Sequence, residues 1–359
     1  SDGKKTVESA AVNVPTEPLG DTVKYDPSQP INDGKDISVE FWEWGSDNLF
    51  QELIDGYTAI HPNVSIKLVN NPWDDYWTKL PLSLGGSNGP AIFNVHNSQH
   101  ENLINYMAPY EVSSDDLDAD FNGVSAHVID GKVYYIDYGI MTGSVYYNKD
   151  MWEAAGLTDA DYPKTWDEMP QFLEKASDVG ADGKTNRYGM VIPGWITWYY
   201  EPFFVNNGVQ MVTPEGRTDL ASDNSIKLVS QLKDWCQKGY TYLATGEDAA
   251  SVMRQNFIDG KALSIVYTSS LFDTMADSCS FDVGMEWLPG GKTKEQELGG
   301  NVLFLPAKND QKVKDASWEF LSYLMSKEVN MIWASESGYL PTRKSVQETE
   351  EGKAFLEKK

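Results

Sequence analysis

Aromatic side chains gather at a few points of the chain where they could take part in ligand binding. Trp42 and Trp44 close one stretch of alternating residues, Trp73 begins another segment, and Trp195 and Trp198 fall in a short run broken by Pro and Gly. A pyranose ring has an apolar C–H face and hydroxyl edges, so its site needs flat aromatic rings and side chains that both donate and accept hydrogen bonds. These clusters therefore predict a site for a sugar-like ligand.

Three other motifs have the letters of catalytic or metal sites but lack the residues that such sites need. Residues 85–89 fit the G-x-S-x-G letters of hydrolases, but a strand should precede that serine and here we expect a helix. His96 and His100 have zinc-helix spacing, but Asn97 stands where a metalloprotease needs Glu. The acidic run at 115–120 lacks the glycine of a calcium loop. We therefore expect neither a metal nor another cofactor.

Composition and charge narrow the class of protein further. The 359 residues include 29 Lys and Arg against 54 Asp and Glu, a net charge of −25 that repels nucleic-acid phosphates. Hydrophobic residues make up 41%, enough for buried cores, yet no apolar run approaches the roughly 18 residues of a membrane span. The length predicts two domains. We expect Cys236 and Cys279 to be unpaired and buried.

The elements that position these residues alternate between strand and helix patterns. Such alternation predicts the α/β class, with a mostly parallel sheet, helices on both faces and ligands beyond the carboxyl ends of the strands. Residues 1–36, rich in Pro and polar residues, predict a flexible tether. The expected strands are 37–44, 64–68, 91–95, 132–147, 263–267 and 302–305. The expected helices are 47–60 after an N-cap at Ser46, 73–80, 166–176 after an N-cap at Thr165, 222–238, 247–258 and 314–335.

Several motifs, in order and at characteristic spacing, give the chain a family resemblance from about Ile37 to Val346. They are E-F-W-E-W-G-S at 40–46, F-Q-E-L-I-D-G-Y-T-A-I-H-P-N-V at 50–64, G-P-A-I-F-N-V-H at 89–96, G-S-V-Y-Y-N-K-D-M-W at 143–152, P-K-T-W-D-E-M at 163–169, F-I-D-G-K-A-L at 257–263 and S-G-Y-L-P-T-R-K-S at 337–345. The chain resembles the extracellular solute-binding proteins of ABC importers, in the carbohydrate-binding branch that is similar to maltose-binding protein.

The resemblance implies a two-lobed periplasmic-binding-protein-like fold with a ligand cleft between the lobes. Three crossings would join them, near 122–127, 261–266 and 306–312. Lobe one would comprise 37–122 and 267–305, and lobe two would comprise 123–266 and 306–359, which places the two cysteines in different lobes. Relatives continue beyond the S-G-Y-L-P motif for several tens of residues, into closing helices of lobe two. We therefore expect either that the sequence is truncated or that this remainder is dispensable.

The resemblance also assigns residues to the ligand. His96 and Asn97 would be polar contacts of the first lobe, Trp195 and Trp198 the aromatic platform of the second, and Gly299 and Gly300 a turn that lets backbone approach the cleft. The complete predicted set is Trp42, Trp44, Trp73, His96, Asn97, Asp137, Tyr138, Trp195, Trp198, Glu201, Tyr267, Gly299 and Gly300.

The function implied is non-catalytic capture of a neutral oligosaccharide and its delivery to the membrane permease of an ABC importer. The receptor would be a monomer outside the cell, a lipoprotein held by the tether or a periplasmic protein, with no nucleic-acid partner. Two alternatives remain open. One is a glycoside hydrolase using Glu43, Asp137 or Glu201, and the other is a receptor of the same fold for a polyamine, glycerol phosphate or metal.

Overall fold

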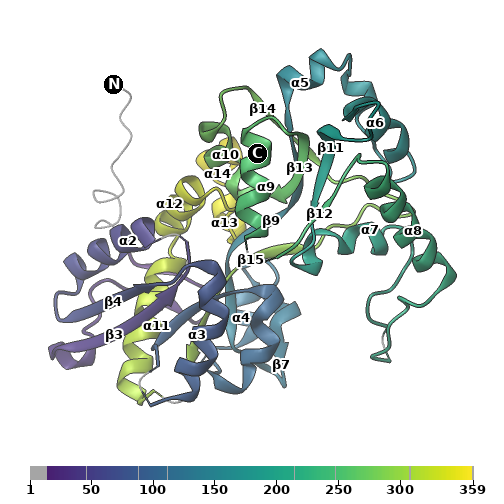
Figure 1. Ribbon diagram of the computed structural model, residues 1–359. Helices are drawn as coiled ribbons and strands as arrows, with labels where there is room; N and C mark the ends of the chain where they lie inside the picture. Colours follow the sequence, from purple (N-terminus) through teal and green to yellow (C-terminus); the bar gives the residue numbers. More distant parts are fainter. Residues whose placement is uncertain are drawn as a thin grey trace. The chain divides into compact units, whose positions relative to one another are not determined.

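A computed structural model describes residues 14–45, 47–87, 89–110, 112–213, 215–246, 248–306 and 309–357. The chain forms two compact units, which we call unit 1 (residues 1–140 and 299–359) and unit 2 (residues 141–298). It passes between them twice, within strand β9 (Tyr135–Asn148) and at the start of strand β15 (Leu298–Pro306). Figure 1 follows the chain through both units.

Unit 1 is built on three parallel strands, β3 (Ile37–Glu43), β4 (Val64–Asn70) and β5 (Ile92–His96), in the order β5-β3-β4. Strand β15 runs antiparallel to β5, with Asn301 opposite His96. Because Glu43 pairs with Asn70 in register, the carboxyl ends of these strands meet at one edge of the sheet. The parallel β-α-β-α-β order expected from the sequence is confirmed.

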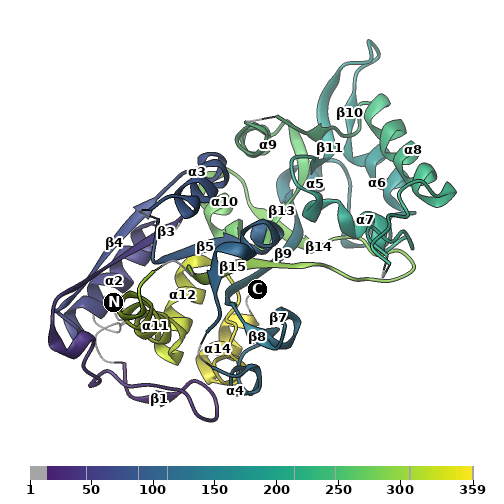
Figure 2. The ribbon, with the colours of Figure 1, turned by 90° about the horizontal axis from the view of Figure 1, so that it is seen from below.

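Helices cover both faces of this sheet, as Figure 2 shows. On one face α2 (Asp47–Ile60) and α11 (Gln311–Met325) pack on β3, where the Phe41 ring lies 4.9 Å from Phe50 and 6.2 Å from Phe320. On the other face α3 (Trp73–Gly85) covers Phe93 and Val95. The two faces of alternating strands therefore bury two separate cores, and the sheet edge stays available for ligand contacts.

The remaining elements of unit 1 are short, apart from one helix. The expected helix at 314–335 is two helices, because the chain breaks at Ser326, whose hydroxyl donates to the Tyr323 carbonyl at 2.6 Å. The elements are β1 (Glu17–Pro18), β2 (Lys24–Tyr25), β6 (Met107–Ala108), α4 (Ser114–Asp118), β7 (Val128–Ile129), β8 (Lys132–Val133), α12 (Lys327–Ser337), α13 (Lys344–Gln347), α14 (Glu350–Leu356) and 3₁₀ turns at 32–34, 97–106 and 124–127.

Residues 14–31, which we call the strap, are packed against unit 1. The prediction of a flexible tether over 1–36 is wrong for this part, because the apolar side chains of Val14, Leu19, Tyr25 and Ile31 enter the core cluster around β3 and α11. Four buried anchors among Pro and polar residues give no period that a sequence pattern could reveal. Residues 1–13 lie outside the described residues.

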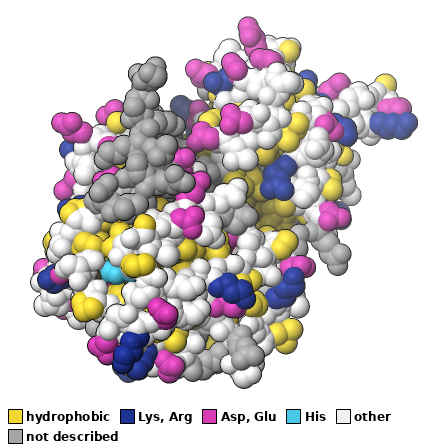
Figure 3. Space-filling view, turned by 90° about the vertical axis from the view of Figure 1, so that its left-hand side faces the viewer, with side chains coloured by type: hydrophobic (Ala, Val, Ile, Leu, Met, Phe, Trp, Pro, Cys, Tyr) yellow, Lys and Arg dark blue, Asp and Glu magenta, His cyan; other side chains and the backbone are white. Residues whose placement is uncertain are grey.

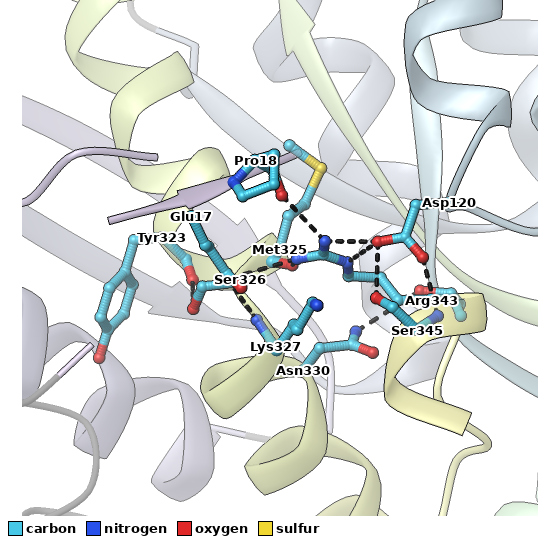
Figure 4. A network of polar contacts seen from close by, with 11 residues as sticks. Glu17, Pro18, Asp120, Tyr323, Met325, Ser326, Lys327, Asn330, Arg343 and Ser345 are labelled. Atoms are coloured by element: carbon cyan, nitrogen blue, oxygen red, sulfur yellow. Dashed lines mark hydrogen bonds and ion pairs between the residues drawn. The ribbon is translucent and has the colours of Figure 1, made fainter. Parts of the chain in front are cut away.

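Arg343, in the S-G-Y-L-P-T-R-K-S motif, fastens the strap to the body of unit 1 (Figure 4). Its guanidinium is 1% exposed and donates to the Asp120 carboxylate at 2.8 Å and to the Pro18 and Met325 carbonyls at 3.0 Å each. Glu17 forms an ion pair with it at 3.3 Å. A buried guanidinium needs this full set of partners, since an unpaired buried charge is strongly destabilising.

Unit 2 has its own mixed sheet, in which β9 pairs with β13 (Ala262–Thr268) and β14 (Val283–Trp287), both antiparallel. Strand β11 (Thr185–Pro193) runs parallel to β13. The other elements of the unit are α5 (Lys149–Ala154), α6 (Met169–Ala176), β10 (Asp178–Val179), α7 (Glu201–Val205), α8 (Asp223–Gln237), β12 (Leu243–Ala244), α9 (Ala249–Ile258), α10 (Phe272–Ser278) and 3₁₀ turns at 159–161, 197–199 and 269–271.

The unit boundaries correct the predicted lobes. Residues 306–359 were expected in lobe two, but α11 buries its apolar stripe against β3 in unit 1, and 123–140 also belong there. Residues 267–298 were expected in lobe one, but β14 pairs with β9 in unit 2. The chain therefore has two passages between units where three were expected. Cys236 and Cys279 are free and share unit 2.

The surface carries the negative charge without one dominant acidic patch on the face drawn in Figure 3, where acidic side chains are scattered. Within the described part of the chain, every helix is too short or too polar to cross a lipid bilayer.

Candidate functional site

The strand ends of unit 1 carry a group of aromatic side chains that we call the unit 1 rim: Trp44, Trp73, Trp77 and His96. Trp44 directly follows β3, and Trp73 begins α3 after Pro72. The Trp44 ring lies 5.4 Å from both Trp73 and Trp77, which are 4.8 Å from each other. All three indoles are half-buried, so each keeps part of its surface for another molecule.

His96 ends β5 and closes the rim from the side, with its ring edge-on to Trp73 at 5.8 Å. Burial removes the imidazole from water and lowers its pKa to about 4. His96 is therefore neutral at neutral pH and offers one donor and one acceptor nitrogen rather than a positive charge. The side chain of Asn97, the next predicted contact, lies outside what the structure describes.

A layer of polar groups lies directly behind the unit 1 rim. The Tyr76 hydroxyl bonds the Asn94 carbonyl at 2.7 Å and the Trp42 carbonyl at 3.1 Å, and Asn71 donates its backbone N–H to the Glu43 carbonyl at 3.0 Å. These bonds fix the ends of β3 and β5 against the start of α3. The predicted set omitted Trp77, Asn94 and Asn71, although Trp77 could have been found from its i+4 spacing to Trp73.

Trp42 differs from the rim in its hydrogen bonding. Like Trp44 and Trp77, its side chain packs against the second core cluster, but its indole N–H donates to Glu40 at 2.6 Å. A donor already engaged in this way is less available to a ligand, so Trp42 supports the strand rather than the rim.

Unit 2 has a second aromatic group, the unit 2 rim, made of Trp195, Tyr199, Tyr267, Arg254, Glu201 and Glu297. Tyr199 lies 5.6 Å from Trp195 and stacks parallel to Tyr267 at 6.0 Å, with an interplanar angle of 8°. Arg254 of α9 donates to the Tyr267 hydroxyl at 3.1 Å, with its guanidinium carbon 6.0 Å from the ring centre. Trp195 is half-buried, whereas Tyr199 and Tyr267 are buried beneath it.

Two carboxyl groups of the unit 2 rim share a hydrogen bond. Glu201 begins α7, directly after the aromatic run, and Glu297 precedes β15. Glu297 is an exposed residue, but partial burial of its carboxyl and the neighbouring Glu201 raise its pKa to about 7. Glu297 therefore holds a proton in part of the molecules near neutral pH. That proton joins the two carboxyl groups, whose other oxygens remain hydrogen-bond acceptors.

The neighbouring Gln296 extends this polar strip. Its Oε1 accepts from the Thr142 hydroxyl at 2.9 Å, and its buried Nε2 has no hydrogen-bond partner among the described residues. An open amide donor beside a carboxyl pair suits hydroxyl-rich molecules, which carry acceptor oxygens.

A family model for bacterial extracellular solute-binding proteins matches residues 52–356. The chain belongs to this family. Among curated relatives of this solute-binding protein is the sn-glycerol-3-phosphate-binding periplasmic protein UgpB of Pectobacterium atrosepticum, 24% identical, with 89% of this chain and 76% of the relative aligned. A putative binding protein of Brucella abortus is 22% identical over 82% of this chain and 72% of its own.

Solved structures share the fold of this solute-binding protein. The GacH receptor of Streptomyces glaucescens, solved unliganded and with acarbose, has a TM-score of 0.75 at 22% identity, over 89% of this chain and 84% of its own. The MalE domain of Bdellovibrio bacteriovorus, bound to maltotriose, has a TM-score of 0.75 at 20% identity, over 89% of this chain and 85% of its own. UgpB of Mycobacterium tuberculosis, in complex with glycerophosphocholine, has a TM-score of 0.75 at 22% identity, over 90% of this chain and 83% of its own. The two-lobed α/β fold of the family is thereby confirmed.

Three further predicted contacts of this solute-binding protein have neighbours within their own units. Tyr138 is fully buried in the unit 1 core, 4.9 Å from the Trp333 ring, so it packs the fold. Asp137 lies 2.6 Å from His127 Nε2, and the buried Trp198 ring lies 4.9 Å from Tyr199. Contact of Asp137 and Trp198 with a ligand stays a prediction.

Gly299 and Gly300 do not form the predicted turn. They lie inside strand β15, and a Cβ at Gly300 would stand 2.1 Å from the Gly139 carbonyl oxygen of β9. Gly300 therefore lets the backbones of β15 and β9 approach closely, which is a packing requirement that only glycine meets.

The donor and acceptor set of both rims suits binding of a neutral, hydroxylated molecule better than metal binding. Among the described residues there is no group of three or more His, Cys, Asp or Glu side chains placed to hold a metal ion. His96 has indole neighbours, and the two glutamates bond each other.

Proposed function

We propose that this solute-binding protein captures a neutral oligosaccharide and delivers it to the permease of an ABC importer. The observation that carries the proposal is that both units present a half-buried indole beside a polar aromatic group: Trp73 beside the neutral His96 in unit 1, and Trp195 beside Tyr199 in unit 2. Such rings bind the C–H faces of sugars, and amide, imidazole and carboxyl groups bind their hydroxyl edges.

The binding free energy expected from these groups is in the range of a transport receptor. Each well-placed ring contributes on the order of 1 kcal/mol, so several rings with a few hydrogen bonds reach the roughly −8 kcal/mol of micromolar binding. Relatives support the sugar class, because similar proteins have been solved in complex with acarbose, maltotriose and cycloalternan. Binding without chemistry is the role that the family description gives.

A hydrolase is less well supported by the geometry. Glycoside hydrolysis needs two carboxyl groups roughly 5 to 9.5 Å apart that flank one bond. Glu201 and Glu297 bond each other directly, Asp137 is engaged by His127, and Glu43 is fully buried. We propose that the protein has no catalytic activity, acts as a monomer and works outside the cell, as a lipoprotein or in a periplasm.

A phosphate-bearing solute is the second candidate, and one observation favours it. Arg254 of the unit 2 rim has no carboxylate partner among the described ion pairs, and it stands over the Tyr267 ring. A guanidinium in that position matches a phosphate well. One similar protein is an sn-glycerol-3-phosphate-binding periplasmic protein, and another has been solved in complex with glycerophosphocholine.

Isothermal titration calorimetry with a ligand panel separates these candidates. The panel contains maltotriose, a cyclic tetrasaccharide, acarbose, sn-glycerol-3-phosphate and glycerophosphocholine, each also incubated overnight with the protein and analysed by chromatography. We expect micromolar or tighter binding of at least one oligosaccharide, no product, and no binding of the phosphates. Binding of the phosphates alone, abolished by Arg254→Met, would replace the sugar by the second candidate, and appearance of shorter sugars would identify an enzyme.

A further inference from the structure

Thr142 lies at the start of unit 2, two residues after Ile140, with which unit 1 ends on this passage. Its backbone N–H donates to the Ser269 hydroxyl at 3.1 Å, and the residue is only 8% exposed. A β-branched residue on a fixed strand has a restricted χ1 angle, so the Thr142 hydroxyl has a defined position. That hydroxyl donates to Gln296 Oε1 at 2.9 Å.

The backbone beside Gln296 is held as well. The preceding residue, Glu295, exchanges two hydrogen bonds with the buried side chain of Asn206: the Glu295 N–H donates to Asn206 Oδ1 at 2.7 Å, and the Asn206 amide donates to the Glu295 carbonyl at 2.9 Å. The Gln296 side chain therefore joins two fixed points, this backbone and the Thr142 hydroxyl. Its Nε2 is buried and has no hydrogen-bond partner among the described residues.

The two ends of the Gln296 amide are not interchangeable in this setting. The Thr142 hydroxyl has Gln296 Oε1 as an acceptor at 2.9 Å, whereas its other acceptor, the Gly143 carbonyl, lies at 3.5 Å, which is long for a hydrogen bond. If the amide turned, the Thr142 hydroxyl would accept from Nε2 and keep only the long bond for its own proton. The hydrogen bonding therefore favours Nε2 as a donor that points away from Thr142.

This donor lies next to members of the unit 2 rim. Gln296 directly precedes Glu297, which belongs to that rim. On β9, a Cβ at Gly143 would stand 4.0 Å from the Trp198 ring, and Trp198 lies 4.9 Å from Tyr199 of the rim. A buried N–H without a partner is unfavourable, so a ligand oxygen that accepts from it removes this penalty on binding.

We propose that Gln296 is a specificity-determining residue whose Nε2 donates to an oxygen of the bound sugar, and that Thr142 is the positioning residue that keeps the amide in this orientation. The inference rests on the proposed function, because it names a contact of the same rim. Ring and glycosidic oxygens accept hydrogen bonds, and so do hydroxyls, so each of them satisfies a fixed donor. Because both ends of Gln296 are held before binding, the contact costs little side-chain entropy.

Calorimetry with maltotriose, acarbose and a cyclic tetrasaccharide tests the contact. Gln296→Met, which is close to glutamine in length but has no donor, should weaken binding of the sugars that bind the wild type by roughly three- to tenfold. Gln296→Glu keeps an oxygen for Thr142 and replaces the donor by a second oxygen once it ionises, so it should lose at least as much. The matched control Gln237→Met, at an exposed glutamine of α8 in unit 2, should bind within about twofold of the wild type.

The positioning role of Thr142 has its own test. Thr142→Val removes the hydroxyl, so the amide can turn and presents its donor in only part of the molecules; sugar affinity should then fall at least about twofold. Thr142→Ser, which keeps a hydroxyl, should restore the wild-type affinity. In the double variant of Thr142→Val and Gln296→Met, binding should be no weaker than in Gln296→Met alone, because Thr142 acts only through the amide.

NMR relaxation of the Gln296 side-chain amide gives a readout that needs no sugar. Its signal is identified as the one that is lost in Gln296→Met. We expect this amide to be rigid in the free wild type and in Thr142→Ser, and mobile in Thr142→Val. An amide that is equally rigid in Thr142→Val would show that Thr142 does not position it.

The affinities can overturn the proposal in separate ways. Wild-type affinity in Gln296→Met would remove the contact. Wild-type affinity in Gln296→Glu, together with a loss in Gln296→Met, would show that the sugar binds an acceptor here and that the amide has the opposite orientation. A greater loss in the double variant than in Gln296→Met would give Thr142 a role of its own. Failure of all three sugars to bind the wild type would overturn the proposed function together with this contact.

Discussion

The two rims present similar aromatic rings but differ in the polar groups beside them. In the unit 1 rim the titratable group is His96, whose pKa is lowered to about 4, so the rim is uncharged at neutral pH. In the unit 2 rim the pKa of Glu297 is raised to about 7 by burial and by the neighbouring Glu201, and Arg254 adds a positive charge. We infer that unit 1 contributes stacking and pH-independent hydrogen bonds, whereas unit 2 makes ligand binding sensitive to pH and to ligand charge.

This comparison depends on which aromatic side chains belong to a rim and which to a core, and the largest expected effect tests that division. Tyr138→Ala should destabilise unit 1 by about 3–5 kcal/mol, because it leaves a cavity against Phe50 and Trp333. Tyr138→Phe should be nearly neutral, since the hydroxyl it removes is buried and has no hydrogen-bond partner among the described residues.

Urea denaturation of the two Tyr138 variants, with sugar titrations on each, measures both effects. If Tyr138→Ala kept wild-type stability while sugar affinity fell tenfold, Tyr138 would be a ligand contact and would belong to the rim.

The next effect concerns Trp73 and Trp195, the half-buried indoles of the two rims. Trp73→Ala and Trp195→Ala should each weaken sugar binding five- to tenfold, about 1 kcal/mol, with the free energy of unfolding changed by less than about 1 kcal/mol. Trp287→Ala is the matched control, because Trp287 is a tryptophan of unit 2 that is 60% exposed and outside both rims. Calorimetry with the sugar of the panel that binds most tightly gives the three affinities. An equal loss of affinity in Trp287→Ala would show that Trp195 is not a specific ligand contact.

The sequence predicted the local elements and part of the rims. Alternating residues located β3, β4 and β5, because the period of a strand is a local property of the chain. Breaker residues and strand ends singled out Trp44, Trp73 and Trp195, whose contact with a ligand stays a prediction.

Local patterns could not predict which residues pack together when they are far apart in the sequence. The apolar stripe of α11 shows that the helix is buried but not against which sheet, so 306–359 were assigned to the wrong lobe. Tyr138 was assigned to the ligand because its position in the family motif does not reveal that Phe50 and Trp333 enclose it. Glu297 has no local signal, since its partner Glu201 lies 96 positions away in the sequence.

A smaller expected effect, the pH dependence of sugar affinity, tests the difference between the two rims. Above pH 7 Glu297 loses the proton that joins it to Glu201, so the two carboxyl groups no longer hold their acceptor oxygens in one fixed arrangement for a ligand hydroxyl. Wild-type sugar affinity should therefore fall about fivefold between pH 6 and pH 8, which is the worth of one hydrogen bond of about 1 kcal/mol. Glu297→Gln keeps an N–H donor at every pH, so its affinity should stay level in the same calorimetric series.

The same carboxyl pair also affects stability, and the sign follows from the raised pKa. Because the unfolded chain releases the Glu297 proton near pH 4.5 and the folded unit near pH 7, unfolding becomes easier as pH rises through that window. Since the Glu297 residue is exposed, Glu297→Gln should gain only about 0.5–1 kcal/mol over wild type at pH 8 and nothing at pH 4. A gain of equal size at both pH values would mean that the pair does not share a proton.

The smallest expected effect is the absence of a pH response in the unit 1 rim. An imidazole with a pKa of about 4 stays neutral from pH 5.5 to pH 8, so His96→Gln removes the same contacts throughout this range. The ratio of wild-type to variant sugar affinity should then be constant within about twofold, in contrast to the ratio for Glu297→Gln. A ratio for His96→Gln that changed more with pH than the Glu297 ratio would assign the pH-sensitive half of the receptor to unit 1.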